Sequence, residues 1–208
     1  MAAKPRNPWL AIPLADYEAH MALPQVGQAE LLAEVLATTL REHAPRSVAI
    51  LGCAGGNGFD RVPLDTRLVG VDVNPDYVAV ARKRHRKRKG LELYVADVAT
   101  DELPFEPVEL AFAGLLFEYL APTRALERIG KTLLPGGALV AVVQLPSKRA
   151  KVTPSPYKSL EALSSGMRLV STAELLKAAL AERYELRAAS VWKASGGKQF
   201  AVHTYRLD

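Results

Sequence analysis

The chain has 208 residues, of which 49% are hydrophobic and 24% charged, and this length and composition suit one compact domain with a sizeable core. No apolar run approaches the ~18 residues that a membrane helix needs. The single cysteine, Cys53, excludes an internal disulfide and a cysteine metal cluster. Residues 1–8 also lack an apolar segment that could form the core of a signal peptide, so we expect a cytoplasmic protein with no membrane partner.

The net charge of +5 comes from one basic run, residues 82–89, which holds seven of the 27 Lys and Arg residues. Such a run either contacts phosphates or is the solvated end of a helix, where cations are favoured near the C-terminus. The run contains no aromatic residue, whereas binding sites for single-stranded nucleic acid combine aromatics with basic residues. We therefore favour the solvated helix end and do not favour a nucleic-acid partner.

Residues 1–24 are rich in proline and aromatic residues, and the prolines predict that this segment does not form one regular helix. From Gln25 the pattern changes to apolar residues at three- and four-residue spacing, which predicts an amphipathic helix that packs on a sheet. These apolar positions are Leu31, Leu32, Val35, Leu36 and Leu40.

From residue 48 onward, short apolar runs alternate with helical patterns, as in a doubly wound parallel sheet. The expected strands are 48–51, 68–73, 91–95, 108–113 and 138–145, and the last is apolar enough to be central. The expected helices are a short one from Phe59, one over 75–87 capped by Asn74, and one over 124–133 that ends near Pro135-Gly136-Gly137.

The end of the chain breaks this alternation. A helix over 174–183 is followed by two strand patterns, 184–192 and 198–207, which are joined by five residues that include two glycines. So short a connection demands an antiparallel hairpin. We therefore predict an α/β fold with a doubly wound, Rossmann-like, mostly parallel seven-stranded sheet that ends in a C-terminal antiparallel hairpin.

The strand over 48–51 runs into a loop that contains Gly52, Gly55, Gly56 and Gly58. Glycines let a backbone turn sharply and approach a ligand closely. The next strand delivers Asp72, 20 residues after Gly52, which is the spacing at which a carboxylate reaches a ribose hydroxyl in nucleotide-binding α/β folds. The pattern predicts a site for an adenosine-containing cofactor.

Four motifs follow one another along the chain: Gly52–Gly58, Gly70–Pro75, Val95–Val98 and Leu134–Gly137. In this order they resemble the successive motifs of class I S-adenosylmethionine-dependent methyltransferases, and the resemblance covers residues 25–208. The terminal hairpin is a further mark of that family. The chain departs from the family pattern at Ile50 and Ala54, where an acid and a glycine are usual. The resemblance implies a methyltransferase domain over 25–208, preceded by an extension over 1–24 that forms a lid.

The resemblance also implies S-adenosylmethionine as the cofactor. The glycine loop would face its methionine carboxylate and ribose, Asp72 would accept hydrogen bonds from the ribose hydroxyls, and Asp97 would accept one from the adenine amino group. The implied cofactor-binding residues are Gly52, Cys53, Ala54, Gly56, Asp72, Val73, Asp97, Val98 and Gly114. Cys53 has no basic partner nearby in the sequence, so we expect a small filler against the cofactor and not a nucleophile.

Candidate catalytic residues come from two regions. After the fourth strand, we expect Glu118 or Tyr119 to lie near the methyl group, where it would accept a proton or form a hydrogen bond with the substrate. The alternative is that this segment only begins a helix. Members of the family that methylate amide or base nitrogens often carry an Asn/Asp-Pro-Pro-aromatic motif here, and this chain has none. In the extension, His20 is a candidate general base, and Tyr17 or His20 is expected in contact with the ligand. No metal is expected, because methyl transfer from a sulfonium requires none and no cluster of ligands has metal-binding spacing.

The sequence is compatible with four functions. We favour methyl transfer to oxygen or nitrogen of a small molecule, and the alternative is an RNA or protein methyltransferase that docks through residues 82–89. A cofactor-binding protein without catalysis is the third. A nicotinamide-dependent oxidoreductase is opposed by the hairpin and by the lack of a clean Gly-x-Gly-x-x-Gly motif.

Overall fold

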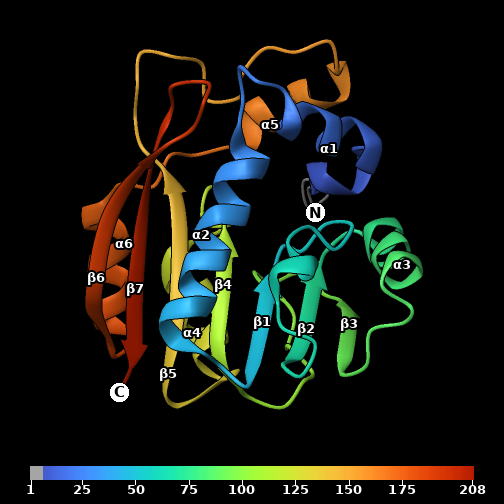
Figure 1. Ribbon diagram of the computed structural model, residues 1–208. Helices are drawn as coiled ribbons and strands as arrows, with labels where there is room; N and C mark the ends of the chain where they lie inside the picture. Colours follow the sequence, from blue (N-terminus) through green and yellow to red (C-terminus); the bar gives the residue numbers. More distant parts are fainter. Residues whose placement is uncertain (1–6) are drawn as a thin grey trace, which may run out of the picture.

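The computed structural model describes residues 7–208, and its seven strands form one sheet (Figure 1). Their order is β3-β2-β1-β4-β5-β7-β6, with β1 to β5 parallel and β7 antiparallel to both β5 and β6. The strands are β1 Ser47–Leu51, β2 Arg67–Asp72, β3 Leu91–Val95, β4 Val108–Gly114, β5 Leu133–Gln144, β6 Tyr184–Lys193 and β7 Gln199–Leu207. This arrangement confirms the predicted doubly wound sheet with a C-terminal antiparallel hairpin.

Helices cover both faces of the sheet, because successive residues of a strand point to opposite faces. Ala49 and Leu51 of β1 pack in a cluster with α4 and α6, whereas Val48 and Ile50 pack with α2. Figure 1 shows α2 in front of the sheet and α6 behind it. The helices are α1 Leu14–Ala22, α2 Gln28–His43, α3 Pro75–Arg84, α4 Pro122–Gly130, α5 Glu161–Gly166 and α6 Thr172–Ala181, with 3-10 turns η1 Pro8–Ala11, η2 Phe59–Arg61 and η3 Lys158–Leu160.

Over residues 7–24 the N-terminal segment does not form one helix, as its prolines predicted, but it contains two separate elements, η1 and α1. Helix α1 runs for nine residues, because Pro13 stands at its N-cap position and Pro24 lies beyond its end, where a proline costs no helical hydrogen bond. The prediction for Asn74 is confirmed, since its side chain accepts a hydrogen bond of 2.9 Å from the backbone N–H of Asp76.

Two other elements differ from the sequence prediction by more than a few residues at an end or in type. The helix expected from Phe59 is only the three-residue turn η2. Strand β5 begins at Leu133, five residues before the expected start, and Pro135-Gly136-Gly137 form a bulge within it. The bulge is possible because Gly136 adopts a φ of +72°, which glycine reaches without strain.

Above the carboxyl ends of the parallel strands, the N-terminal segment meets the segment after β5 (Figure 1). Ile12 packs against Leu160 and Leu163, and the hydroxyl of Ser159 donates a hydrogen bond of 2.6 Å to Asp16. We call these two segments, residues 7–24 and 146–167, the roof. Among residues 7–208, no helix is long and apolar enough to cross a bilayer.

Candidate active site

A cavity of about 430 Å³ lies between the carboxyl ends of the parallel strands and the roof. This is the edge at which open α/β sheets bind ligands. Its floor follows the order of the strands, with Asp97 after β3, Asp72 at the end of β2, Gly52 after β1 and Gly114 at the end of β4. Its roof includes Pro8, Trp9, Tyr17, His20, Met21, Leu160, Leu163 and Met167.

Asp72 is 8% exposed and lines the cavity from the end of β2. One carboxylate oxygen accepts the backbone N–H of Ala54 at 2.8 Å, and the other accepts that of Asn74 at 2.9 Å. Burial raises the pKa of this carboxyl group, and the backbone hydrogen bonds oppose the rise. The two bonds fix the carboxylate between the glycine loop and β2, and a carboxylate oxygen can accept a second hydrogen bond from a ligand. Asp72 and the neighbouring Val73 therefore occupy a position that suits a ribose.

Gly52, Gly56 and Gly58 of the loop have different environments. Gly52 has a φ of +74° and lines the cavity, and a Cβ there would meet only Leu116, at 3.5 Å. A Cβ at Gly56 would lie 2.7 Å from His85, and one at Gly58 would lie 2.8 Å from Leu36. Gly52 therefore leaves room for a ligand, whereas Gly56 allows α3 to pack closely. Gly56 lines a second hollow, between the loop and α2, and not the main cavity.

Most backbone N–H groups of this loop donate within the protein. Those of Gly52 and Cys53 donate to the carbonyl of Val71, and that of Ala54 donates to Asp72. Because η2 is a single turn, the loop does not open onto a helix that could bind an anion at its N-terminus. Cys53 is 1% exposed and packs in the core with the α2 face; burial, supported by the charge of Asp72, raises the pKa of its thiol. Cys53 does not line the main cavity, whereas Ala54 does.

At the β3 end of the cavity, Asp97 and Val98 are lining residues. One oxygen of Asp97 accepts the backbone N–H of Ala99 at 2.8 Å, and the other accepts the side-chain amide of Asn7 at 3.5 Å. Asp97 is thus held at the edge of the cavity where the family resemblance places the adenine.

The other end of the cavity, at β5 and β7, is polar and buried. Lys198 is 3% exposed and donates to the side chain of Gln144 at 3.3 Å and to the carbonyl of Lys151 at 2.5 Å. Burial, supported by the charge of Arg149, lowers the pKa of Lys198 to about 8. Lys198 was not predicted from the sequence, because it lies outside the four motifs and its neighbours come from segments 47 and 54 residues away.

The structure brings three of the four candidate catalytic residues to the cavity, and the fourth, Glu118, lies outside it. Tyr17, His20 and Tyr119 line the cavity, and Trp9 contacts both tyrosine rings edge-on, with centroids at 5.4 and 5.1 Å. Burial raises the pKa of both tyrosines, so their phenols stay protonated and act as donors. Glu118 is 1% exposed and does not line the cavity.

His20 is the imidazole that faces the cavity, and its Nδ1 bonds to the hydroxyl of Ser155 at 2.9 Å. Burial and the charge of Lys198 lower the pKa of His20, so the ring is neutral at neutral pH. Glu118 instead accepts the backbone N–H of Gln144 at 2.6 Å through one oxygen, and the other oxygen has no hydrogen-bond partner in residues 7–208. Burial raises the pKa of Glu118 to about 7.

Residues 50–141 match the family model described as a methyltransferase domain. Trans-aconitate 2-methyltransferase from Rhodopseudomonas palustris strain BisB5 is 31% identical over 138 residues, which are 64% of this chain and 51% of that protein. The same enzyme from strain HaA2 is 32% identical over 138 residues, again 64% of this chain and 51% of that protein. The chain thus spans about half the length of the curated relatives that it matches.

The N-methyltransferase NodS from Bradyrhizobium japonicum, solved with S-adenosyl-L-homocysteine, has a TM-score of 0.67 at 17% identity over 93% of this chain and 97% of its own. The [4+2]-cyclase SpnF has a TM-score of 0.63 at 18% identity over 83% of this chain and 80% of its own. Such distant structures show the shared fold, and the cyclase illustrates that the fold alone does not determine the reaction. The motif residues Gly52, Asp72 and Asp97 lie in chain order at the carboxyl ends of β1, β2 and β3 around one cavity, and the matched family model covers all three. The chain is therefore similar to class I S-adenosylmethionine-dependent methyltransferases in its matched domain, its fold and the order of its motifs.

Proposed function

We propose that the protein is an enzyme that transfers a methyl group from S-adenosylmethionine to oxygen or nitrogen of a small molecule. The observation that carries this proposal is the shape of one cavity with two chemically different ends. The carboxylates of Asp72 and Asp97 lie at the β2 and β3 end, and Lys198 and Gln144 lie at the β5 and β7 end. A cofactor at the first end leaves the second for an acceptor.

The cofactor, when bound, supplies a methyl group on a sulfonium, which is a good leaving group. Asp72 would hold the ribose, Asp97 the adenine amino group, and Gly52 and Gly114 would leave space for the sulfonium end. In the roof, Trp9, Tyr17 and Tyr119 would exclude water and align the acceptor.

A hydroxyl or amine acceptor must lose a proton when the new bond to carbon forms. His20 would take that proton through Nε2, because burial lowers the pKa of the ring and Nδ1 would donate to the hydroxyl of Ser155. A carboxylate acceptor carries no proton and would need no base.

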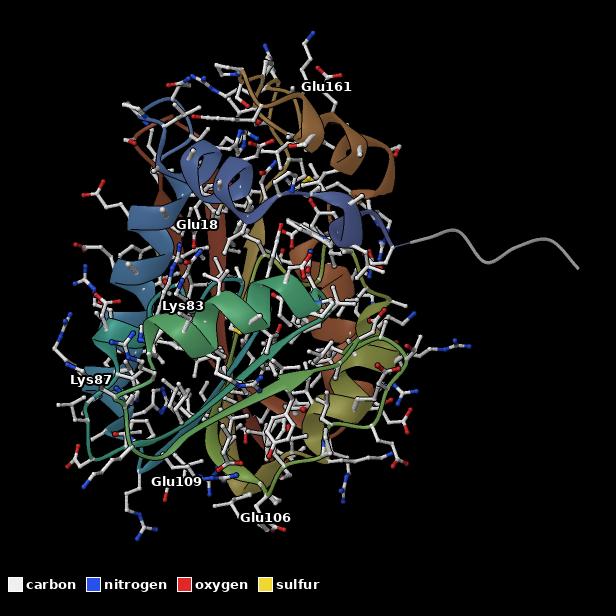
Figure 2. All side chains as sticks on the ribbon, turned by 90° about the vertical axis from the view of Figure 1, so that its right-hand side faces the viewer. Glu18, Lys83, Lys87, Glu106, Glu109 and Glu161 are labelled. Carbon is white, nitrogen blue, oxygen red and sulfur yellow. The ribbon has the colours of Figure 1, made fainter. Side chains whose placement is uncertain are left out.

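The RNA or protein alternative depends on residues 82–89, and three of the seven Lys and Arg side chains in this run bind within the protein. Arg84 pairs with Glu18 of α1, Arg88 donates to backbone carbonyls at 62, 63 and 66, and Arg82 donates to the carbonyl of Leu93. Figure 2 shows Glu18 above α3 and Lys87 at the edge of the molecule, well away from Glu161 in the roof. These contacts support a structural role for residues 82–89, in which Arg84 stabilises the roof and Arg88 stabilises the loop before β2.

The proposal is tested by following methyl transfer from radiolabelled S-adenosylmethionine to three classes of acceptor: small organic acids including trans-aconitate, total RNA, and a protein extract. We expect label in the small-molecule fraction and none in the others. Label confined to RNA or protein would refute the small-molecule acceptor, and the absence of S-adenosylhomocysteine binding would refute the enzyme itself.

A further inference from the structure

The cavity contains a buried ammonium group without a counterion. Lys198 stands just before β7, is 3% exposed, and its amine donates to two neutral oxygens, those of the Gln144 amide and the Lys151 carbonyl. Within residues 7–208, no Asp or Glu lies within 4 Å of this amine. A buried charge without a partner is costly, so stability alone does not explain a lysine here.

The surroundings of Lys198 are neutral or cationic. His20 lies close enough for the charge of Lys198 to lower the pKa of the imidazole. The charge of Arg149 likewise lowers the pKa of Lys198. The side-chain amide of Gln28 donates to the side-chain oxygen of Gln144 at 3.5 Å. This Gln144 oxygen therefore accepts hydrogen bonds from both Gln28 and Lys198. Glu118 bonds to the backbone of Gln144 but forms no ion pair with Lys198 among the described residues.

The order of the strands separates this cation from the acids of the cavity. Asp72 ends β2, and Lys198 precedes β7, so that β1, β4 and β5 lie between them. At about 4.8 Å between neighbouring strands, the two positions are roughly 19 Å apart. A ribose held by Asp72 therefore cannot reach Lys198.

We propose that Lys198, with Gln144, binds a carboxylate of the methyl acceptor, so that the acceptor is a small organic acid. This inference rests on the proposed function, because it assigns the second end of the same cavity. An ammonium and a carboxylate form a short, charge-assisted hydrogen bond, and in a buried site the bond is strong. The acceptor would supply the anion that the chain itself does not place there.

The test is a calorimetric titration of trans-aconitate, and separately of citrate, into the protein saturated with S-adenosylhomocysteine. The key variant is Lys198→Met, and the matched control is Lys193→Met, which removes an exposed lysine at the end of β6 in the same hairpin. We expect trans-aconitate to bind the wild type and Lys193→Met equally and Lys198→Met at least 10-fold more weakly. The uncharged triamide of aconitic acid should not bind, and all three proteins should bind S-adenosylhomocysteine alike.

Three results would overturn the inference while leaving the proposed function in place: equal trans-aconitate affinity for Lys198→Met and wild type, equal affinity for the acid and its triamide, or no binding of either acid. Weaker S-adenosylhomocysteine binding by Lys198→Met would also overturn it, because the lysine would then hold the cofactor. Lys198→Gln, which keeps a donor without the charge, replaces Lys198→Met if the latter does not fold. Failure of the wild type to bind S-adenosylhomocysteine would refute the proposed function instead.

Discussion

Asp72 combines two tasks, because its carboxylate fixes the glycine loop through Ala54 and also faces the cavity. Asp72→Asn keeps an oxygen for one of the backbone bonds but removes the charge that a ribose hydroxyl would meet. We expect the variant to bind S-adenosylhomocysteine ~1.5–3 kcal/mol more weakly, the range for a lost charged hydrogen bond. Calorimetric titration measures this loss. Asp65→Asn, at an exposed position, is the control and should bind as the wild type does. Equal affinity in Asp72→Asn would refute the ribose assignment.

Glu118 makes stability depend on pH. Its folded pKa is about 7 against an ordinary value of 4.5, so the folded protein holds a proton that the unfolded chain releases. The contribution to stability is complete below pH 4.5 and is lost as the pH rises to about 7, by up to about 3 kcal/mol. Glu118→Gln cannot ionise, so its free energy of unfolding should fall less between pH 5 and pH 8 than that of the wild type.

Urea unfolding at the two pH values measures this difference. Glu161→Gln, at an exposed position on α5, is the control and should follow the wild type. If Glu118→Gln and the wild type lose the same free energy between pH 5 and pH 8, the buried carboxyl is not the cause.

At the residue scale, local motifs predicted the cofactor end of the cavity better than the acceptor end. Asp72 and Asp97 were predictable because each directly follows a strand in a motif of fixed spacing. Gly56 and Cys53 share the loop but are turned toward α3 and the core, and a one-dimensional pattern does not show this. Lys198 acquires its environment only when β5, β7 and the roof meet, so no local pattern indicated it.

At the scale of elements, the first segment of the roof is tied to the start of α3. The side-chain amide of Asn74 donates to the carbonyl of Trp9 at 2.9 Å, and the hydroxyl of Tyr77 donates to that of Ile12 at 2.8 Å. A chain that starts at Gln25 lacks Trp9, Tyr17, His20 and Met21, which line the cavity. We expect it to keep the circular dichroism of the sheet, to lose methyl transfer and to lose most of its affinity for S-adenosylhomocysteine.

The control for that truncation is Glu18→Gln in the full chain, which breaks the ion pair with Arg84 but leaves α1 in place. An ion pair this exposed contributes at most about 1 kcal/mol to stability, so the affinity for S-adenosylhomocysteine should change little. Full affinity in the truncated chain would mean that the N-terminal segment only packs on the fold and does not close the site.

The boundaries of elements were harder to predict than their order. The prolines of residues 8–24 predict a break in regular structure, and they stand at the ends of α1, where they are tolerated. The glycines at 136 and 137 predict the end of a helix, but they form a bulge inside β5, because pairing with β4 continues on both sides of them. In both cases the residue type indicated an irregularity in the backbone, and contacts with distant parts of the chain determined what form it takes.

At the scale of the whole molecule, the net charge of +5 is concentrated in residues 82–89. Replacing the exposed Lys83, Arg86, Lys87 and Lys89 with Gln spares the three arginines that bind within the protein. We expect methyl transfer to a small acceptor to stay within twofold of the wild type. RNA binding by the wild type that weakens steeply with salt, and a flatter salt dependence in the variant, would contradict a small-molecule acceptor.

The topology was predictable as a whole, because the alternation of strands and helices and one short hairpin leave few arrangements of the sheet. If the cavity above β1 to β4 holds S-adenosylmethionine, its demethylated product must bind there as well. Calorimetric titration of the wild-type protein with S-adenosylhomocysteine and, separately, with NAD measures this. We expect saturable one-to-one binding of S-adenosylhomocysteine and no heat from NAD. Tight binding of NAD with no response to S-adenosylhomocysteine would contradict the assignment of this cavity to S-adenosylmethionine.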